Sequence, residues 1–143
     1  MNGDTHVRSL ALWLVLLAAA ATAGDRDPAA YVVVDGVSIP EPLTGAPGDA
    51  ARGAAVAADP ARGGCLACHR GAAALDGVGS RLDAGRLRLM VVNYALVDPG
   101  VAKPAYYDIP DADGHDDAAP LPETRLTAGD VEDVVAWLAT LTE

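Results

Sequence analysis

The residues best equipped for chemistry lie in one pentapeptide, Cys65-Leu66-Ala67-Cys68-His69, which contains the only two cysteines of the chain. Two thiols three positions apart on a helical turn can each form a thioether with a vinyl group of haem. The imidazole that follows is then directed at the iron as an axial ligand. The C-x-x-C-H spacing therefore predicts one covalent haem c, attached through both cysteines, with His69 as the proximal ligand.

Other uses of these thiols are less well supported. A structural zinc site needs four ligands, and beyond the three in the motif only His115 or a carboxylate is available. A thioredoxin-like dithiol would stand in a βαβ context, which this sequence does not show. A lone cysteine pair in an exported protein is usually a disulfide, but the adjacent histidine favours haem attachment.

The first 23 residues have the layout of a secretory signal peptide. Arg8 precedes an apolar run at 10–21, and the small residues Ala-Thr-Ala at 21–23 end it. A spanning helix needs roughly 20 apolar residues, so this shorter run favours a cleaved signal over a membrane anchor. We expect cleavage after Ala23 and export to the periplasm, where bacteria attach c-type haem.

Composition limits the partners and the core of the remaining chain, residues 24–143, which has the usual size of one domain. The formal net charge of −10 disfavours nucleic acid and anionic membranes. It suits protein partners with basic surfaces. The chain has no phenylalanine, and its apolar residues are mainly alanine and valine, so a large apolar cofactor would complete a thin core.

The N-terminal half is expected to begin with an extended arm at 24–48, rich in glycine, proline and aspartate, lying over the surface. The Ala-rich stretch 49–59 opens the domain at 49–143 and predicts a helix that Pro60 stops. The haem motif should begin a second, short helix.

The C-terminal half begins with a loop, which Gly77 and Gly79 predict, and a third helix at 83–97. Residues 98–123 hold five prolines and seven acidic residues, which predicts an irregular loop. Thr127 and Asp130 have capping-box spacing ahead of an apolar stripe at helical spacing, formed by Val131, Val134, Val135, Leu138 and Leu141. Three or four short helices make an all-α domain.

Several stretches beyond the haem motif resemble one family. They are VDG at 34–36, IPEPL at 39–43, GDAARG at 48–53, GCLACH at 64–69, GVGSR at 77–81, LRL at 87–89 with VV at 91–92, PAYY at 104–107 and LTAGDVEDVVAWL at 126–138. In these, the chain resembles SoxX, the small monohaem cytochrome subunit of the SoxAX complex of bacterial sulfur oxidation. The resemblance implies a class I cytochrome c-like fold, in which Gly53 and Trp137 would meet where the first and last helices cross.

The resemblance also implies a function. SoxAX joins thiosulfate oxidatively to a cysteine of the carrier SoxYZ, an L-cysteine S-thiosulfotransferase activity whose chemistry belongs to the monohaem or dihaem SoxA subunit. The X subunit would accept the released electrons and pass them to a soluble cytochrome. No independent catalytic set is seen in this chain. An independent periplasmic electron shuttle and a haem-based ligand sensor are the alternative functions.

The PAYY stretch supplies two further candidates for the haem site. The hydroxyls of Tyr106 and Tyr107 could reach a haem propionate, or the two rings could simply cap the core. The residue directly before this stretch is Lys103, at the position where the family has its distal methionine.

The sixth iron ligand is therefore open. Lys103 is the best single candidate, while Met90, His115 and water are the alternatives. The family also usually has a longer segment after the motif, with a proline whose carbonyl fixes the proximal histidine. Here only residues 70–76 intervene, without a proline, which leaves the support of His69 in question.

Overall fold

The computed structural model describes residues 29–101, 103–107 and 124–143. The expected signal peptide, His115 and most of the proline-rich loop lie outside this range. The described chain forms five α-helices and no strand, with α1 at Ala50–Ala58, α2 at Cys65–Cys68, α3 at Val78–Arg81, α4 at Ala84–Val92 and α5 at Ala128–Thr140. An all-α domain is thus confirmed. None of the helices in this part of the chain is long and apolar enough to cross a membrane.

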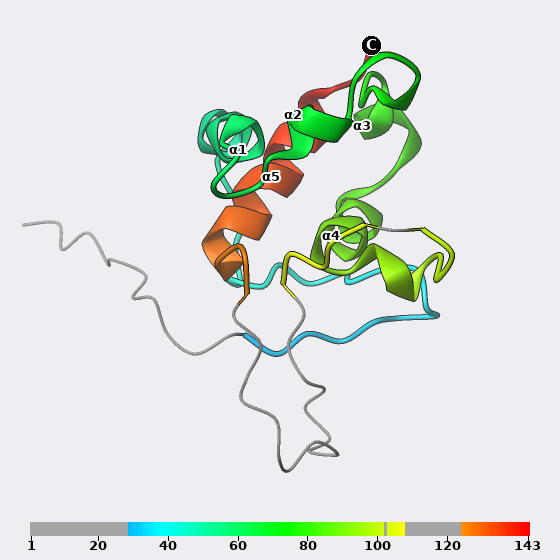
Figure 1. Cartoon of the computed structure of the whole chain (residues 1–143). Coiled ribbons are helices and arrows are strands. Elements are labelled where there is room, and N and C mark those ends of the chain that lie inside the picture. Colours follow the sequence, from blue (N-terminus) through cyan, green and yellow to red (C-terminus); the bar gives the residue numbers. More distant parts are fainter. Residues whose placement is uncertain (1–28, 102, 108–123) are drawn as a thin grey trace, which may run out of the picture.

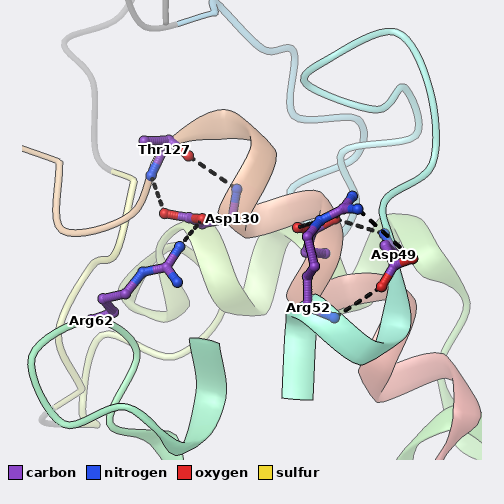
Figure 2. Close-up of polar contacts among 6 residues, drawn as sticks. Asp49, Arg52, Arg62, Thr127 and Asp130 are labelled. Carbon is purple, nitrogen blue, oxygen red and sulfur yellow. Dashed lines mark hydrogen bonds and ion pairs between the residues drawn. The ribbon is translucent and has the colours of Figure 1, made fainter. Parts of the chain in front are cut away.

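Helix α5 is the centre of the fold, with α1 packed along one side and α4 along another (Figure 1). Its first turn is fixed by the predicted capping box. The Thr127 hydroxyl accepts from the Asp130 amide at 3.1 Å, and the Thr127 amide donates to the Asp130 carboxylate at 3.2 Å. Figure 2 shows this exchange. These bonds satisfy amides that the first helical turn leaves without partners, so the helix begins where the sequence predicted.

Helices α1 and α5 cross at the glycine that the sequence identified. A Cβ atom on Gly53 would lie 1.9 Å from the Asp133 carbonyl oxygen and 2.9 Å from the Trp137 Cβ. Both distances are well inside van der Waals contact, so only glycine permits this approach. The expected meeting of Gly53 with Trp137 is therefore confirmed.

The region between the haem motif and α4 differs from the prediction of a loop. Gly77 adopts the left-handed conformation, at φ 68°, and begins α3. Gly79 lies inside α3, where a Cβ would come within 2.5 Å of the Ala139 carbonyl oxygen. The two glycines thus start a short helix and let it pack against α5. Helix α3 is therefore one helix more than the sequence predicted.

The third predicted helix, at 83–97, is also shorter than expected. Helix α4 starts at its N-cap Asp83, as predicted, but ends at Val92. The Asn93 side chain then accepts from the Ala95 amide at 3.0 Å and opens a 3-10 turn at Tyr94–Leu96. An asparagine side chain that bonds its own backbone in this way competes with continuation of the helix.

The arm at 29–48 contributes to the core instead of lying wholly on the surface. Ile39 and Leu43 are only 1% and 8% exposed. A buried ion pair holds this segment, with Arg88 donating to Glu132 through Nε at 2.7 Å and through Nη2 at 2.9 Å. Arg88 Nη1 also donates to the Ile39 carbonyl at 2.6 Å, and the Leu43 amide donates to Glu132 at 2.8 Å. The pair therefore ties α4, α5 and the arm together.

A second carboxylate on α5 anchors the start of α1. Arg52 donates to Asp133 through Nε at 2.7 Å, and the Asp49 amide donates to the same carboxylate at 2.6 Å. Arg52 also reaches the Asp49 side chain (Figure 2). Burial raises the pKa of Asp133, but the hydrogen bonds from Arg52 and Asp49 outweigh it and hold that pKa below its ordinary value.

This depressed pKa predicts an acid-sensitive contribution to stability. A carboxylate with a lowered folded-state pKa stabilises the fold above its unfolded-state pKa, about 3.9, and loses that contribution as pH falls through the folded-state value. We expect Asp133→Asn to lower the free energy of unfolding at neutral pH, and the deficit to shrink as pH falls below about 4. Urea unfolding over a pH series measures this. The exposed Asp76→Asn should show no such convergence, and a pH-independent deficit in Asp133→Asn would contradict the prediction.

Candidate functional site

A cavity of about 300 Å³ lies among α2, α4, α5 and residues 101 and 103–107. Its walls are largely apolar, formed by Leu75, Val78, Leu87, Met90, Val91, Val101, Leu126, Val134, Trp137 and Leu138. Its polar lining consists of Cys65, His69, Tyr94, Lys103 and Tyr106. Helix α2 is well separated from the segment 103–107, which runs beside α4 (Figure 1). Because both line the cavity, they bound it from different sides.

Two glycines directly before the haem motif allow the chain to place the motif beside this cavity. Gly64 has φ 58° and turns the chain into α2. A Cβ on Gly63 would lie 2.7 Å from the Val56 carbonyl oxygen, so glycine lets this turn press against α1. Cys65 then faces the cavity, and Cys68 is exposed one helical turn later. Both thiols are free.

Burial raises the pKa of the Cys65 thiol, although Lys103 and Tyr106 act in the opposite direction. The thiol is therefore held mainly in its protonated form. That suits a half-buried sulfur at a position where the sequence predicts a neutral thioether.

The His69 ring is oriented by the segment that follows the motif. Its Nδ1 lies 2.9 Å from the Ala73 carbonyl oxygen, in a 3-10 turn at Gly71–Ala73. A carbonyl only accepts, so Nδ1 is the donor, which leaves Nε2 as the ring nitrogen for a metal. The short segment thus provides the backbone acceptor that a proline carbonyl would otherwise supply. Gly71, at φ 56°, is the sequence signal for this tight turn.

Lys103 lies on the cavity wall, and its ammonium group is turned inward. Its Nζ donates to the Met90 carbonyl and lies 5.0 Å from the centroid of the Tyr94 ring. Burial lowers the pKa of Lys103, while the nearby Cys65 opposes this effect. Met90 also lines the cavity, so the structure brings two of the predicted sixth-ligand candidates to one place.

The two tyrosines of the PAYY stretch lie in different environments. Tyr106 lines the cavity and stacks under the Arg125 guanidinium, 5.4 Å from the ring centroid. Tyr107 is 1% exposed and is not part of the cavity lining. Its hydroxyl donates to the Ala29 carbonyl at 3.4 Å. Tyr107 therefore secures the arm, and Tyr106 is the tyrosine in a position to contact a cofactor.

These residues fit a covalently attached haem. Two free thiols stand at the motif spacing, His69 donates through Nδ1 and keeps Nε2 for a metal, and ten apolar side chains form the walls. Apolar walls with a few convergent polar groups are typical of a cofactor site. Within the described residues, no group of three or more His, Cys, Asp or Glu side chains is placed to hold a metal ion directly.

An all-α domain whose C-x-x-C-H segment opens on an apolar cavity has the fold of a cytochrome c-like protein. The crystal structure of SoxXA from P. pantotrophus contains a chain that is 33% identical and superimposes with a TM-score of 0.68. The alignment covers 82% of this chain and 100% of that chain. This chain belongs to the SoxX family of Sox-type cytochrome subunits. No protein-family profile matches the sequence, and no curated protein matches it significantly.

Proposed function

We propose that this chain is the periplasmic electron-transfer subunit of a SoxAX-type complex and carries one covalent haem c. The observation that carries the proposal is the placement of Cys65 and His69 on one apolar cavity, with the free nitrogen of His69 available to iron. The likeness to a chain of SoxXA, which extends over 82% of this chain, supports the choice of complex.

The cysteines would attach the cofactor without an oxidant. Each thiol adds across one vinyl double bond, so a carbon–sulfur bond forms and the thiol hydrogen passes to the terminal vinyl carbon. Cys65 holds the cofactor from inside the cavity, and Cys68 holds it at the exposed side. When bound, the haem supplies a one-electron redox centre.

The residues of this chain then tune and shield that centre. His69 ligates the iron, and the Ala73 carbonyl keeps the ring in one tautomer and orientation. The apolar walls exclude water from most of the cofactor. Because both thiols are consumed by attachment, the chain has no cysteine left for sulfur chemistry of its own.

The electrons would come from the partner's reaction. A bond forms between the outer sulfur of thiosulfate and the cysteine sulfur of a SoxYZ-type carrier, the thiol releases one proton, and two electrons leave. We infer that a SoxA-type cytochrome subunit carries out this L-cysteine S-thiosulfotransferase step. This chain accepts the electrons one at a time and delivers them to a soluble cytochrome.

Haem attachment is tested by expression of the full chain with the cytochrome c maturation machinery. We expect a periplasmic band, shortened by the signal peptide, that keeps its haem-peroxidase stain on a denaturing gel. Its mass should exceed that of the processed polypeptide by one haem. Cys65→Ala combined with Cys68→Ala should abolish the stain, whereas Leu66→Ala, at an exposed position between them, should keep it. An unstained wild-type band would contradict the proposal.

Complex formation is tested by purifying the tagged holoprotein from the periplasm of cells that co-express SoxA-type subunits. A second, larger cytochrome that stays bound through gel filtration would support the SoxAX-type assignment. A monomer that is reduced by other periplasmic donors would instead favour the independent shuttle. Rapid binding of carbon monoxide at a vacant ferrous site would favour the ligand sensor.

A further inference from the structure

Lys103 is the one lysine of the sequence, and it points into the cavity where the cofactor would bind. Lysine side chains normally keep the ammonium group in water even when the aliphatic stem is covered. This one instead bonds the Met90 carbonyl and lies over the Tyr94 ring. Among the described residues that line the cavity there is no carboxylate to balance its charge.

We propose that Lys103 Nζ is the second axial ligand of the haem iron, with His69 as the first. This inference rests on the proposed haem attachment and adds the identity of the ligand. Loss of a proton makes the amine a nitrogen donor, and bonding to iron then satisfies it in a site that holds no counter-ion among its described residues. The four-carbon side chain can exchange the Met90 carbonyl for the iron by rotation of its own bonds.

The other donors on the cavity wall are less well placed. Met90 belongs to the last turn of α4, so its backbone is fixed by that helix. Tyr106 would have to bind as a phenolate, but burial raises the pKa of its hydroxyl. Lys103 lies outside the helices, in a segment that the Tyr106 and Tyr107 amides fasten to the Val92 carbonyl. Its backbone is thereby held beside the cavity while its side chain is left able to move.

Two neighbours position the amine. The Met90 carbonyl accepts from Nζ, and the electron-rich face of Tyr94 attracts it. Together they hold the end of the side chain in the cavity instead of in solvent. A lysine that only stabilises the fold would not bind the iron. The spectra of the haem iron therefore distinguish a ligating lysine from a structural one.

The test uses the full-length holoprotein and compares ferric visible, near-infrared and EPR spectra. The wild type should be low-spin, without the sulfur-to-iron charge-transfer band of methionine ligation. Lys103→Ala should lose the low-spin signal and bind added imidazole readily. Lys103→Arg should lose it too, because it keeps length and charge but cannot be deprotonated. Lys103→Met should introduce the sulfur-to-iron band and raise the midpoint potential.

Met90→Leu tests the competing sulfur donor: it keeps the backbone carbonyl that Nζ bonds and an apolar wall, so the ferric protein should stay low-spin. Unaltered low-spin spectra in both Lys103→Ala and Lys103→Arg would overturn the assignment. Loss of the low-spin state in Met90→Leu would move the role to Met90. These outcomes all presuppose an attached haem, so failure of haem attachment in the wild type is a separate result, which contradicts the proposed function first.

Discussion

A chain with both Cys65 and Cys68 replaced by alanine should lose its cooperative thermal unfolding transition. Without an attached cofactor, the cavity of about 300 Å³ would stand open among the side chains of the core. Cavities in proteins cost about 24 cal/mol per Å³, which amounts to at most about 7 kcal/mol here. Small domains are stable by only about 5–15 kcal/mol in total. A loss of that size is comparable with the whole stability of a domain at the lower end of this range.

The measurement is circular dichroism during heating, applied to holoprotein, the double variant and Leu66→Ala. Leu66 is 41% exposed and lies between the two cysteines, so its replacement tests for a general effect of mutation in α2. We expect the control to unfold cooperatively near the wild-type temperature. A double variant that unfolds with the same sharpness and temperature as the holoprotein would show that the polypeptide core suffices alone.

Arg88→Met should cost about 3–5 kcal/mol of unfolding free energy, the usual effect of removing one partner from a buried ion pair. The side chains of Arg88 and Glu132 are 3% and 2% exposed. Removal of the guanidinium leaves the Glu132 carboxylate buried, with the Leu43 amide as its one remaining donor among the described residues. It also leaves the Ile39 carbonyl without the bond from Arg88. The arm should loosen as well, since the same cluster holds it.

Urea unfolding and limited proteolysis of the holoprotein measure the two effects. Arg86→Met is the matched control, because Arg86 is on the same helix but half-exposed, 3.7 Å from Asp83. Such an exposed pair is worth about 0–1 kcal/mol. Arg88→Met combined with Glu132→Leu should recover much of the loss, because no charge is then left buried. A single variant as stable as Arg86→Met would refute this account of the cluster.

The features predicted correctly from sequence are those set by near neighbours in the chain. Asp49 and Thr127 begin helices because their side chains reach amides three residues ahead. The apolar stripe of α5 follows from the helical period and is buried from Val131 to Leu138. The C-x-x-C-H motif is also a local pattern, and haem attachment through it stays a prediction. Gly53 was found through the resemblance, and its role depends on a close approach that only glycine allows.

Gly77 and Gly79 show where the local signals misled. In isolation, glycines weaken a helix by about 1 kcal/mol relative to alanine, so a loop was the natural expectation. Contact with the end of α5 reverses this preference, because Gly79 must lack a side chain to lie against Ala139. Tertiary packing therefore decides the conformation of α3.

The sequence alone determined the helical class and the starts of the main helices, and it predicted the haem-attachment residues, because each depends on patterns within a turn or two of the chain. Only the tertiary structure decided that Arg88 pairs with Glu132 across 44 positions. It also decided that Tyr106, but not Tyr107, faces the cavity, and that Lys103 points inward. The packed chain decides which side chains are buried and which groups they pair with. A charged or aromatic side chain can face either the core or solvent, and neighbours from distant segments determine which.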